Sequence, residues 1–206
     1  MKVIKPYVEI CDTIDGDAIL KKIEKCGRVC YKSEGKVYDG SAEKFVKNII
    51  KRGHESVLEH VSITLKFVVD RGVSHEIVRH RLASYSQEST RYCNYIKEDF
   101  GSEITFILPY FFEGSATYDV WACTMQICEN AYFELLKIGA SPEEARSVLP
   151  HSLKTEVVMT MNLRELRHFL KLRVAKDAHP QMREVARPLL GTLKELIPVV
   201  FDDIWF

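Results

Sequence analysis

A period-two alternation of apolar residues most strongly constrains the fold of this chain. Between positions 61 and 69, every odd position is apolar: Val61, Ile63, Leu65, Phe67 and Val69. Three of the four residues between them are polar. Because successive side chains of a strand point to opposite faces, this pattern predicts a half-buried β-strand with one face in a core.

A continuous apolar stripe predicts one long helix near residues 116–139. Its members are spaced alternately three and four residues apart: Tyr118, Trp121, Met125, Cys128, Tyr132 and Leu135. That spacing is typical of one face of an α-helix. We interpret the stripe as core or as a seam between subunits rather than as a cofactor site, because apolar helical stripes usually pack.

Shorter patterns complete the expected fold. They predict strands near 3–10, 104–108 and 157–161, and helices near 15–31, 42–51, 73–80, 163–173 and 182–196. We see no internal repeat, linker or low-complexity segment. The expected architecture is a single α+β domain over residues 1–206, with a mostly antiparallel sheet flanked by helices.

The charge balance and the apolar runs narrow the possible partners. The chain has 29 Lys+Arg against 29 Asp+Glu, so it lacks the basic excess of a general nucleic-acid or membrane-surface binder. The chain contains no run of 18 apolar residues, so the sequence predicts no membrane-spanning helix. The first residues lack a signal-type apolar core, so we expect a cytoplasmic location with reduced thiols; the six cysteines form no C-x-x-C pair.

The glycines form neither of the two common phosphate-binding loops, G-x-G-x-x-G and G-x-x-x-x-G-K-[ST]. If the protein binds a nucleotide, side chains must therefore hold the phosphates. Arginine suits that role, because its guanidinium forms paired hydrogen bonds to phosphate oxygens.

The densest group of such side chains lies between Arg79 and Tyr92. Ser89 and Arg91 are two residues apart, so in an extended segment they would share a face and could converge on one phosphate or ribose. Charged runs are usually solvated surface, however. An anion-binding segment and a basic surface turn both remain open from these residues alone.

The segment from His54 to His60 resembles a zinc-binding helix, with acidic residues between two histidines. Six residues correspond to about 240° of rotation on a regular α-helix, so the two imidazoles could not share one ion there. We therefore expect no metal site.

A second polar group is predicted on the helix near 163–173. Arg164 and His168 are four residues apart and share a face, whereas the leucines of this helix face the core. This face is either a ligand site or an ordinary solvated surface. Arg146, on a short helix that begins after Ser141, is by itself more typical of a surface arginine.

Taken together, these patches resemble the flavin-dependent thymidylate synthases. The hallmark of that family is Arg-His-Arg, then seven residues, then Ser, which corresponds here to Arg79-His80-Arg81 and Ser89. Three further patches agree in order and spacing: His54-Glu55-Ser56 with Glu59-His60, Ala145-Arg146 before Val148-Leu149-Pro150, and Asn162 through Arg173. The sequence departs from the usual family pattern at Glu76, Ser86 and Gln87, where Gln, Asn and Glu are common.

The resemblance implies an enzyme that methylates dUMP at C5 to give dTMP. Methylenetetrahydrofolate would supply the carbon, and FAD reduced by NADPH would supply the hydride. It also implies a homotetramer whose active sites are shared between subunits.

Residue roles follow from the same resemblance. Residues that would bind dUMP are Glu76, Arg79, Gln87, Glu88, Ser89, Thr90, Arg91, Arg146 and Arg173. Residues that would bind FAD are Ser56, Arg79, His80, Arg81, Gln87, Asn162, Arg164 and His168. Arg173 would be catalytic, by polarising the uracil ring.

The cysteines agree with an arginine mechanism. The classical thymidylate synthase uses a cysteine that follows proline, and no cysteine here does so. A guanidinium against the N3/O2 edge of uracil could instead stabilise the negative charge that develops there. Two other functions remain open: a nucleotide- or nucleic-acid-binding module that uses the Arg79–Arg91 strip, and a metal hydrolase at His54 and His60.

Overall fold

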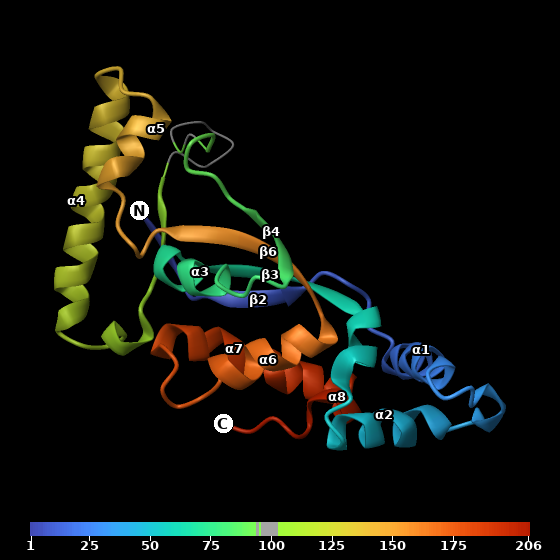
Figure 1. Cartoon of the computed structure of the whole chain (residues 1–206). Helices are drawn as coiled ribbons and strands as arrows, with labels where there is room; N and C mark the ends of the chain where they lie inside the picture. Colours follow the sequence, from blue (N-terminus) through green and yellow to red (C-terminus); the bar gives the residue numbers. More distant parts are fainter. Residues whose placement is uncertain (94, 96–102) are drawn as a thin grey trace. The chain divides into compact units, whose positions relative to one another are not determined.

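The computed structural model describes residues 1–93, 95 and 103–206, which form two compact units (Figure 1). Each unit consists of three separate segments of the sequence. The first unit comprises Met1–Tyr7, Phe67–Arg79 and Tyr85–Val158, and the second comprises Val8–Lys66, His80–Ser84 and Met159–Phe206. The expectation of a single domain over residues 1–206 stays a prediction.

A four-stranded antiparallel sheet contains the strand that the alternation predicts. Its order is β2-β3-β6-β4, with β2 at Tyr7–Ile10, β3 at Ser62–Asp70, β6 at Lys154–Asn162 and β4 at Ala83–Gln87. Ile63, Leu65 and Phe67 of β3 are buried, whereas Ser62 is exposed. The expectation of an α+β fold with a mostly antiparallel sheet flanked by helices is confirmed.

The prediction of one continuous strand over residues 3–10 is wrong. The segment forms two strands, β1 (Lys2–Ile4) and β2, separated at Lys5-Pro6. β1 pairs in parallel with β5 (Thr105–Ile107), whereas β2 lies at the edge of the four-stranded sheet. Proline has a fixed φ and no N–H to donate, so a strand is readily interrupted there.

The first unit is built around the predicted long helix, α4 (Thr117–Lys137). Trp121, Met125 and Tyr132 of its apolar stripe are buried in one core with residues such as Phe106, which confirms the core interpretation for them. Among the described residues of this unit, the other helical segments are α3 (Arg71–Ile77), α5 (Pro142–Ala145) and the 3-10 turns η4 (Tyr110–Phe112) and η5 (Arg146–Val148).

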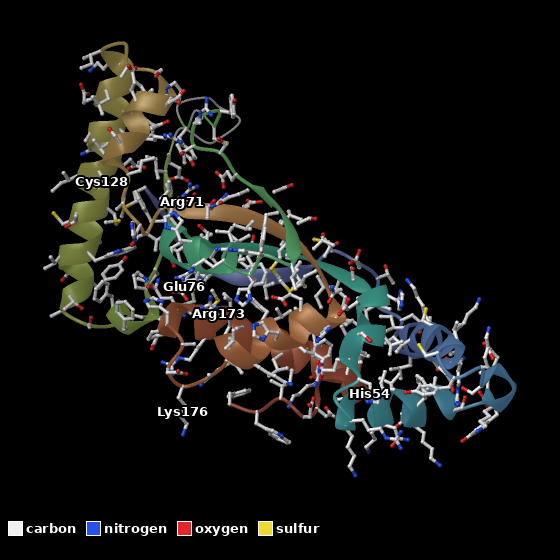
Figure 2. All side chains as sticks on the ribbon, viewed as in Figure 1. His54, Arg71, Glu76, Cys128, Arg173 and Lys176 are labelled. Carbon is white, nitrogen blue, oxygen red and sulfur yellow. The ribbon has the colours of Figure 1, made fainter. Side chains whose placement is uncertain are left out.

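Helix α3 begins two residues earlier than its apolar pattern predicts. Asp70 is its N-cap, and its carboxylate accepts a hydrogen bond from the backbone N–H of Val73 at 2.9 Å. This cap compensates for Gly72 in the first turn. It also places the side chain of Arg71 at the start of the helix (labelled in Figure 2).

The second unit is mainly helical. Its segments are α1 (Gly16–Val29), η1 (Glu34–Lys36), α2 (Ser41–Lys51), η2 (Glu55–His60), α6 (Leu163–Arg173), α7 (Pro180–Leu196) and α8 (Pro198–Phe201). Helix α6 packs against both η2 and α7. Within residues 1–93, 95 and 103–206, no helix combines the length and the apolar composition required to cross a bilayer.

Candidate functional site

Side chains from three segments of the first unit meet at Thr155, a fully buried residue of β6. Arg71 Nη1 lies 3.2 Å from Thr155 Oγ1 and 3.3 Å from the carbonyl oxygen of Glu88. Gln87 Nε2 donates to Ser74 Oγ at 3.0 Å and to Thr155 Oγ1 at 3.3 Å. Both hydrogen bonds are intramolecular and use the amide nitrogen of Gln87. Its amide oxygen is therefore the atom left to accept a hydrogen bond from a ligand.

Glu88 is held by an ion pair that the sequence analysis missed. Its carboxylate lies 2.9 Å from Lys154 Nζ, which is also 2.9 Å from the carboxylate of Glu156. Burial lowers the pKa of Lys154, but its hydrogen bonds to Glu156 and Glu88 outweigh burial and the pKa is raised overall. Lys154 therefore stays charged and offsets the repulsion that Glu88 would otherwise exert on a bound anion.

Thr90 and Arg146 lie side by side although 56 residues separate them in the sequence. Arg146 Nη1 lies 3.3 Å from Thr90 Oγ1, and Thr90 is buried. Arg146 is half-buried and follows α5, whose start is closed by a capping box between Ser141 and Glu144. A guanidinium has five N–H donors, so this single bond leaves donors for a phosphate.

Ser89 and Arg91 do not lie in an extended segment. Strand β4 ends at Gln87, and the amides of Tyr92 and Cys93 both donate to the Ser89 carbonyl, which makes a turn. Ser89 and Arg91 therefore do not share the face of a strand, contrary to the expectation for an extended segment. Within the turn, the backbone N–H of Arg91 donates to Ser89 Oγ at 3.3 Å, so the Ser89 hydroxyl proton can point to a ligand.

Arg91 is exposed and already paired with an acid. Its Nε lies 3.1 Å from the carboxylate of Glu143, with both side chains about half exposed, and its guanidinium lies 5.4 Å from the centre of the Tyr92 ring. Such surface pairs are weak, so a phosphate could replace Glu143 at little cost.

The second unit contains a polar cluster around His80, which consists of His80, Glu165, His168 and Arg173; His80 is buried, whereas His168 is exposed. The side chain of His80 is 5% exposed, and its Nδ1 lies 3.4 Å from Glu165 Oε1. On the other side of the ring, Arg173 Nε donates to His80 Nε2 at 3.0 Å. The ring of Phe169 packs edge-on against the imidazole, with 4.9 Å between ring centres, and His168 lies at 6.1 Å.

His80 is neutral in this cluster. Burial lowers the pKa of the imidazole, and the Arg173 guanidinium lowers it further, while Glu165 acts in the opposite direction. Because Nε2 accepts from Arg173, it must be the unprotonated nitrogen, and Nδ1 carries the proton that faces Glu165. Arg173 lies at the end of α6 (labelled in Figure 2).

This hydrogen-bond pattern disfavours a metal ion at the cluster. Possible ligand atoms of His80, Glu165 and His168 lie within 4.8 Å of one another, a grouping found only here among the described residues. A metal would need the lone pair of His80, however, and the bond from Arg173 already occupies it. The cluster is better suited to an organic ligand.

His54 and His60 do not lie on a regular α-helix, contrary to the expectation from the sequence. The segment between them is the 3-10 helix η2, not a regular α-helix, so the rotation of about 240° does not apply. A 3-10 helix rises about 2 Å per residue, which separates residues six apart by roughly 12 Å. Among the described residues, the one group of at least three possible ligand side chains contains neither His54 nor His60.

A cavity of about 560 Å³ lies beside the His80 cluster in the second unit. It contains three of the predicted cofactor ligands, which are Asn162, Arg164 and His168. Its other lining residues are Glu55, Glu59, Leu82, Glu165 and Lys171. Arg164 lies 2.6 Å from Glu59, an exposed pair.

Two further cavities of the second unit differ in their relation to the predicted site. One, of about 450 Å³, is lined by residues that include Ser56, His54 and Arg164, so it contains one more predicted cofactor ligand. The other, of about 940 Å³, lies among α1, α2 and residues 196–198 and is lined by no predicted site residue. Size alone therefore does not identify the site.

Asn162 has a structural task that the sequence analysis did not assign. It is the N-cap of α6, and its side-chain oxygen accepts from the backbone N–H of Glu165 at 2.9 Å. The cap holds Glu165 in the first turn of the helix, within reach of His80.

The motif itself is divided between the units. Glu76 and Arg79 belong to the first unit, whereas His80 and Arg81 belong to the second. Arg79 and Arg81 are exposed, and Glu76 is half-buried on α3 (Figure 2). The assembly of residues from both units into one site stays a prediction.

Six polar residues of these clusters were missed by sequence reasoning: Arg71, Ser74, Lys154, Thr155, Glu156 and Glu165. A weak signal existed for Lys154 and Glu156, which are two apart on a strand and therefore share a face. Thr155 and Glu165 gave no signal, because single threonines and glutamates are common everywhere.

Comparison with known proteins gives one consistent family. The family model described as "Thymidylate synthase complementing protein" matches residues 14–199. A flavin-dependent thymidylate synthase from Geobacter sulfurreducens is 37% identical over 188 residues, covering 85% of this chain and 78% of that protein. Another from Thermococcus onnurineus is 39% identical, covering 77% of this chain and 66% of that protein.

Solved structures agree in fold. A UMP/dUMP methylase, PolB from Streptomyces cacaoi, was crystallised with 5-bromo-dUMP and is 25% identical to this chain. It superposes with a TM-score of 0.79 over 98% of this chain and 96% of its own. A second structure of that methylase, with 5-bromo-UMP, has the same TM-score at 22% identity and supports the fold alone.

Proposed function

This chain belongs to the flavin-dependent thymidylate synthase family, and from that premise we propose that it converts dUMP to dTMP, with methylenetetrahydrofolate as carbon donor and NADPH-reduced FAD as hydride source. It is an enzyme of the methyltransferase class. The observation that carries the proposal is the family match over residues 14–199, which spans the Arg79-His80-Arg81 and Ser89 hallmark.

We assign dUMP to the polar residues of the first unit, together with Arg173. Arg146, held against Thr90, supplies a partly buried guanidinium for the phosphate. Ser89 and the amide oxygen of Gln87 supply one donor and one acceptor. The full proposed set is Glu76, Arg79, Gln87, Glu88, Ser89, Thr90, Arg91, Arg146 and Arg173.

We assign the flavin dinucleotide mainly to residues of the second unit. Such a cofactor needs cations for its pyrophosphate and an apolar surface for its ring. The cavity of about 560 Å³ supplies Arg164, Lys171, the N-terminal turn of the 11-residue helix α6 and the exposed side chain of Leu82. The proposed ligands are Ser56, His80, Arg81, Asn162, Arg164 and His168 of the second unit, together with Arg79 and Gln87 of the first.

In the proposed mechanism, Arg173 activates the uracil ring. Its guanidinium would lie against the N3/O2 edge, where it stabilises the negative charge that develops as C5 becomes nucleophilic. The bond from its Nε to His80 sets the orientation of the guanidinium plane. FAD, when bound, supplies the hydride chemistry.

Assembly and location are also part of the proposal. A homotetramer with shared active sites follows from the family resemblance, and the outer face of α4 supports it, since Val120 and Ile127 are 71% and 62% exposed there. A cytoplasmic location agrees with the six free cysteines.

The direct test is turnover of dUMP with methylenetetrahydrofolate and NADPH, with and without FAD. We expect dTMP only when flavin is present. A folded, flavin-loaded protein that makes no product would contradict the assignment of substrate. Oligonucleotide binding that weakens with salt, without any flavin binding, would favour the alternative module that uses the Arg79–Arg91 strip.

Cys93 is expected to be dispensable. Burial raises the pKa of its thiol, and the neighbouring Glu88 carboxylate raises it further, so little thiolate forms near neutral pH. Cys93→Ala should therefore keep kcat within about twofold, since the nucleophilic form is scarce. A folded Cys93→Ala protein without turnover would contradict the arginine mechanism.

The same pKa shift predicts slow alkylation of Cys93. Iodoacetamide at pH 8 should modify the exposed Cys11, Cys30 and Cys123 before it modifies Cys93. Peptide mass spectrometry over time measures the rate of modification at each cysteine.

A further inference from the structure

Three polar groups form an ordered chain in the second unit: the Glu165 carboxylate, the His80 imidazole and the Arg173 guanidinium. The carboxylate lies 3.4 Å from His80 Nδ1, and Arg173 Nε lies 3.0 Å from His80 Nε2. The residues are far apart in sequence, because 85 positions separate His80 from Glu165. The fold therefore brings these three side chains together.

Glu165 determines which imidazole nitrogen of His80 donates a hydrogen bond and which one accepts. A neutral imidazole carries one proton, and the nitrogen without it is the acceptor. A carboxylate can only accept, so Glu165 favours the proton on Nδ1 and leaves the Nε2 lone pair for Arg173. With the proton on Nε2, two N–H groups would face each other and the bond to Arg173 would be lost.

The structure keeps Glu165 fixed at this position. Its side chain is 12% exposed, and its backbone N–H is bound by the N-cap Asn162. Phe169 packs against the imidazole edge-on and prevents the ring from turning freely. A single protonated nitrogen and a held ring together give Arg173 one favourable orientation.

We propose that Glu165 is a positioning residue, which acts through the Nδ1–H form of His80 to orient the Arg173 guanidinium toward the substrate. The part that concerns substrate rests on the proposed function, in which Arg173 polarises the uracil ring. The part that concerns the tautomer of His80 rests on the geometry of the three residues alone.

The test uses Glu165→Gln in the full-length holoenzyme. Glutamine has nearly the same shape, but its amide can either accept from or donate to Nδ1, so the preference for one tautomer is lost. Glu195→Gln is the matched control, because Glu195 is an exposed residue of α7, outside the proposed site. Circular dichroism and thermal unfolding verify that both variants fold.

Two measurements are compared. Nitrogen-15 NMR of histidine-labelled protein reports the tautomer of His80, assigned by the signal that disappears in His80→Gln among the seven histidines. Steady-state kinetics report kcat and KM for dUMP. We expect Glu165→Gln to shift His80 toward the Nε2–H form and to lower kcat about 10-fold with little change in KM, as for loss of one charge-assisted hydrogen bond.

Several outcomes would overturn the proposal. If the His80 tautomer is unchanged, Glu165 does not control the imidazole, whatever happens to kcat. If the tautomer shifts while kcat stays at the level of Glu195→Gln, the imidazole does not position Arg173 for the reaction. If the unmodified enzyme makes no dTMP, the proposed function fails, while a tautomer shift would still support control of His80 by Glu165.

Discussion

Replacement of Arg173 by alanine is expected to lower kcat for dTMP formation by on the order of 10²–10³-fold while FAD stays bound. The loss follows from the charge that must build up on the uracil ring when no cysteine adds to it. A fixed guanidinium stabilises that charge without rearrangement. Product formation measures the first part, and the flavin absorbance of the purified protein measures the second.

Two further variants distinguish a specific role of the Arg173 guanidinium from a general effect of removing an arginine. Arg173→Lys keeps the charge but loses the planar fork and the Nε–H that binds His80, so we expect it to recover little activity. Arg183→Ala removes a half-buried arginine outside the proposed site, which donates to the carbonyl of Lys176, and it should behave as the unmodified enzyme. Equal loss of flavin and turnover in Arg173→Ala would instead give Arg173 a cofactor or structural role through His80.

The largest expected effect on stability is at Arg167. Its side chain is 1% exposed, and its guanidinium binds both carboxylate oxygens of Asp203 at 2.7 Å, Glu55 at 3.1 Å and the carbonyl of Val200. Arg167→Ala should reduce the free energy of unfolding by about 3 kcal/mol, because it leaves acids and a carbonyl without their partner. Urea unfolding followed by circular dichroism measures this change.

Arg164 on the same helix provides the matched control for Arg167. It forms an ion pair with Glu59, but both side chains are about half exposed. Measured on both variants without FAD, Arg164→Ala should leave the urea midpoint almost unchanged, since exposed pairs contribute little. Similar midpoints for the two variants would contradict the view that burial makes Arg167 a structural residue.

Contacts within the second unit explain why two of the family-like patches occur together. Glu55 of η2 binds Arg167, and Glu59 of η2 binds Arg164, so η2 and α6 are joined by two ion pairs. Part of the patch that begins at His54 therefore has a structural task. The resemblance identified both patches, but only the fold shows which of their charges stabilise it.

The sequence alone determined the main elements, because their burial repeats with a fixed period. Strand β3 and helix α4 were predicted within one or two residues, and the predicted helix over residues 163–173 is α6 itself. A strand buries every second residue and a helix every third or fourth, so one face of each element is visible in the order of residues. The Arg79-His80-Arg81 and Ser89 hallmark was equally readable, since it lies in one continuous segment.

Only the tertiary structure decided which polar side chains meet. Glu88 binds Lys154, 66 residues away, and Arg146 binds Thr90, 56 residues away. Strand β4 was missed because its residues show no apolar alternation. The hydrogen bond of Gln87, the last residue of β4, to Thr155 was therefore missed as well. Such contacts depend on the register between strands and on the rotation of each helix against its neighbour, and no local pattern of residues specifies either one.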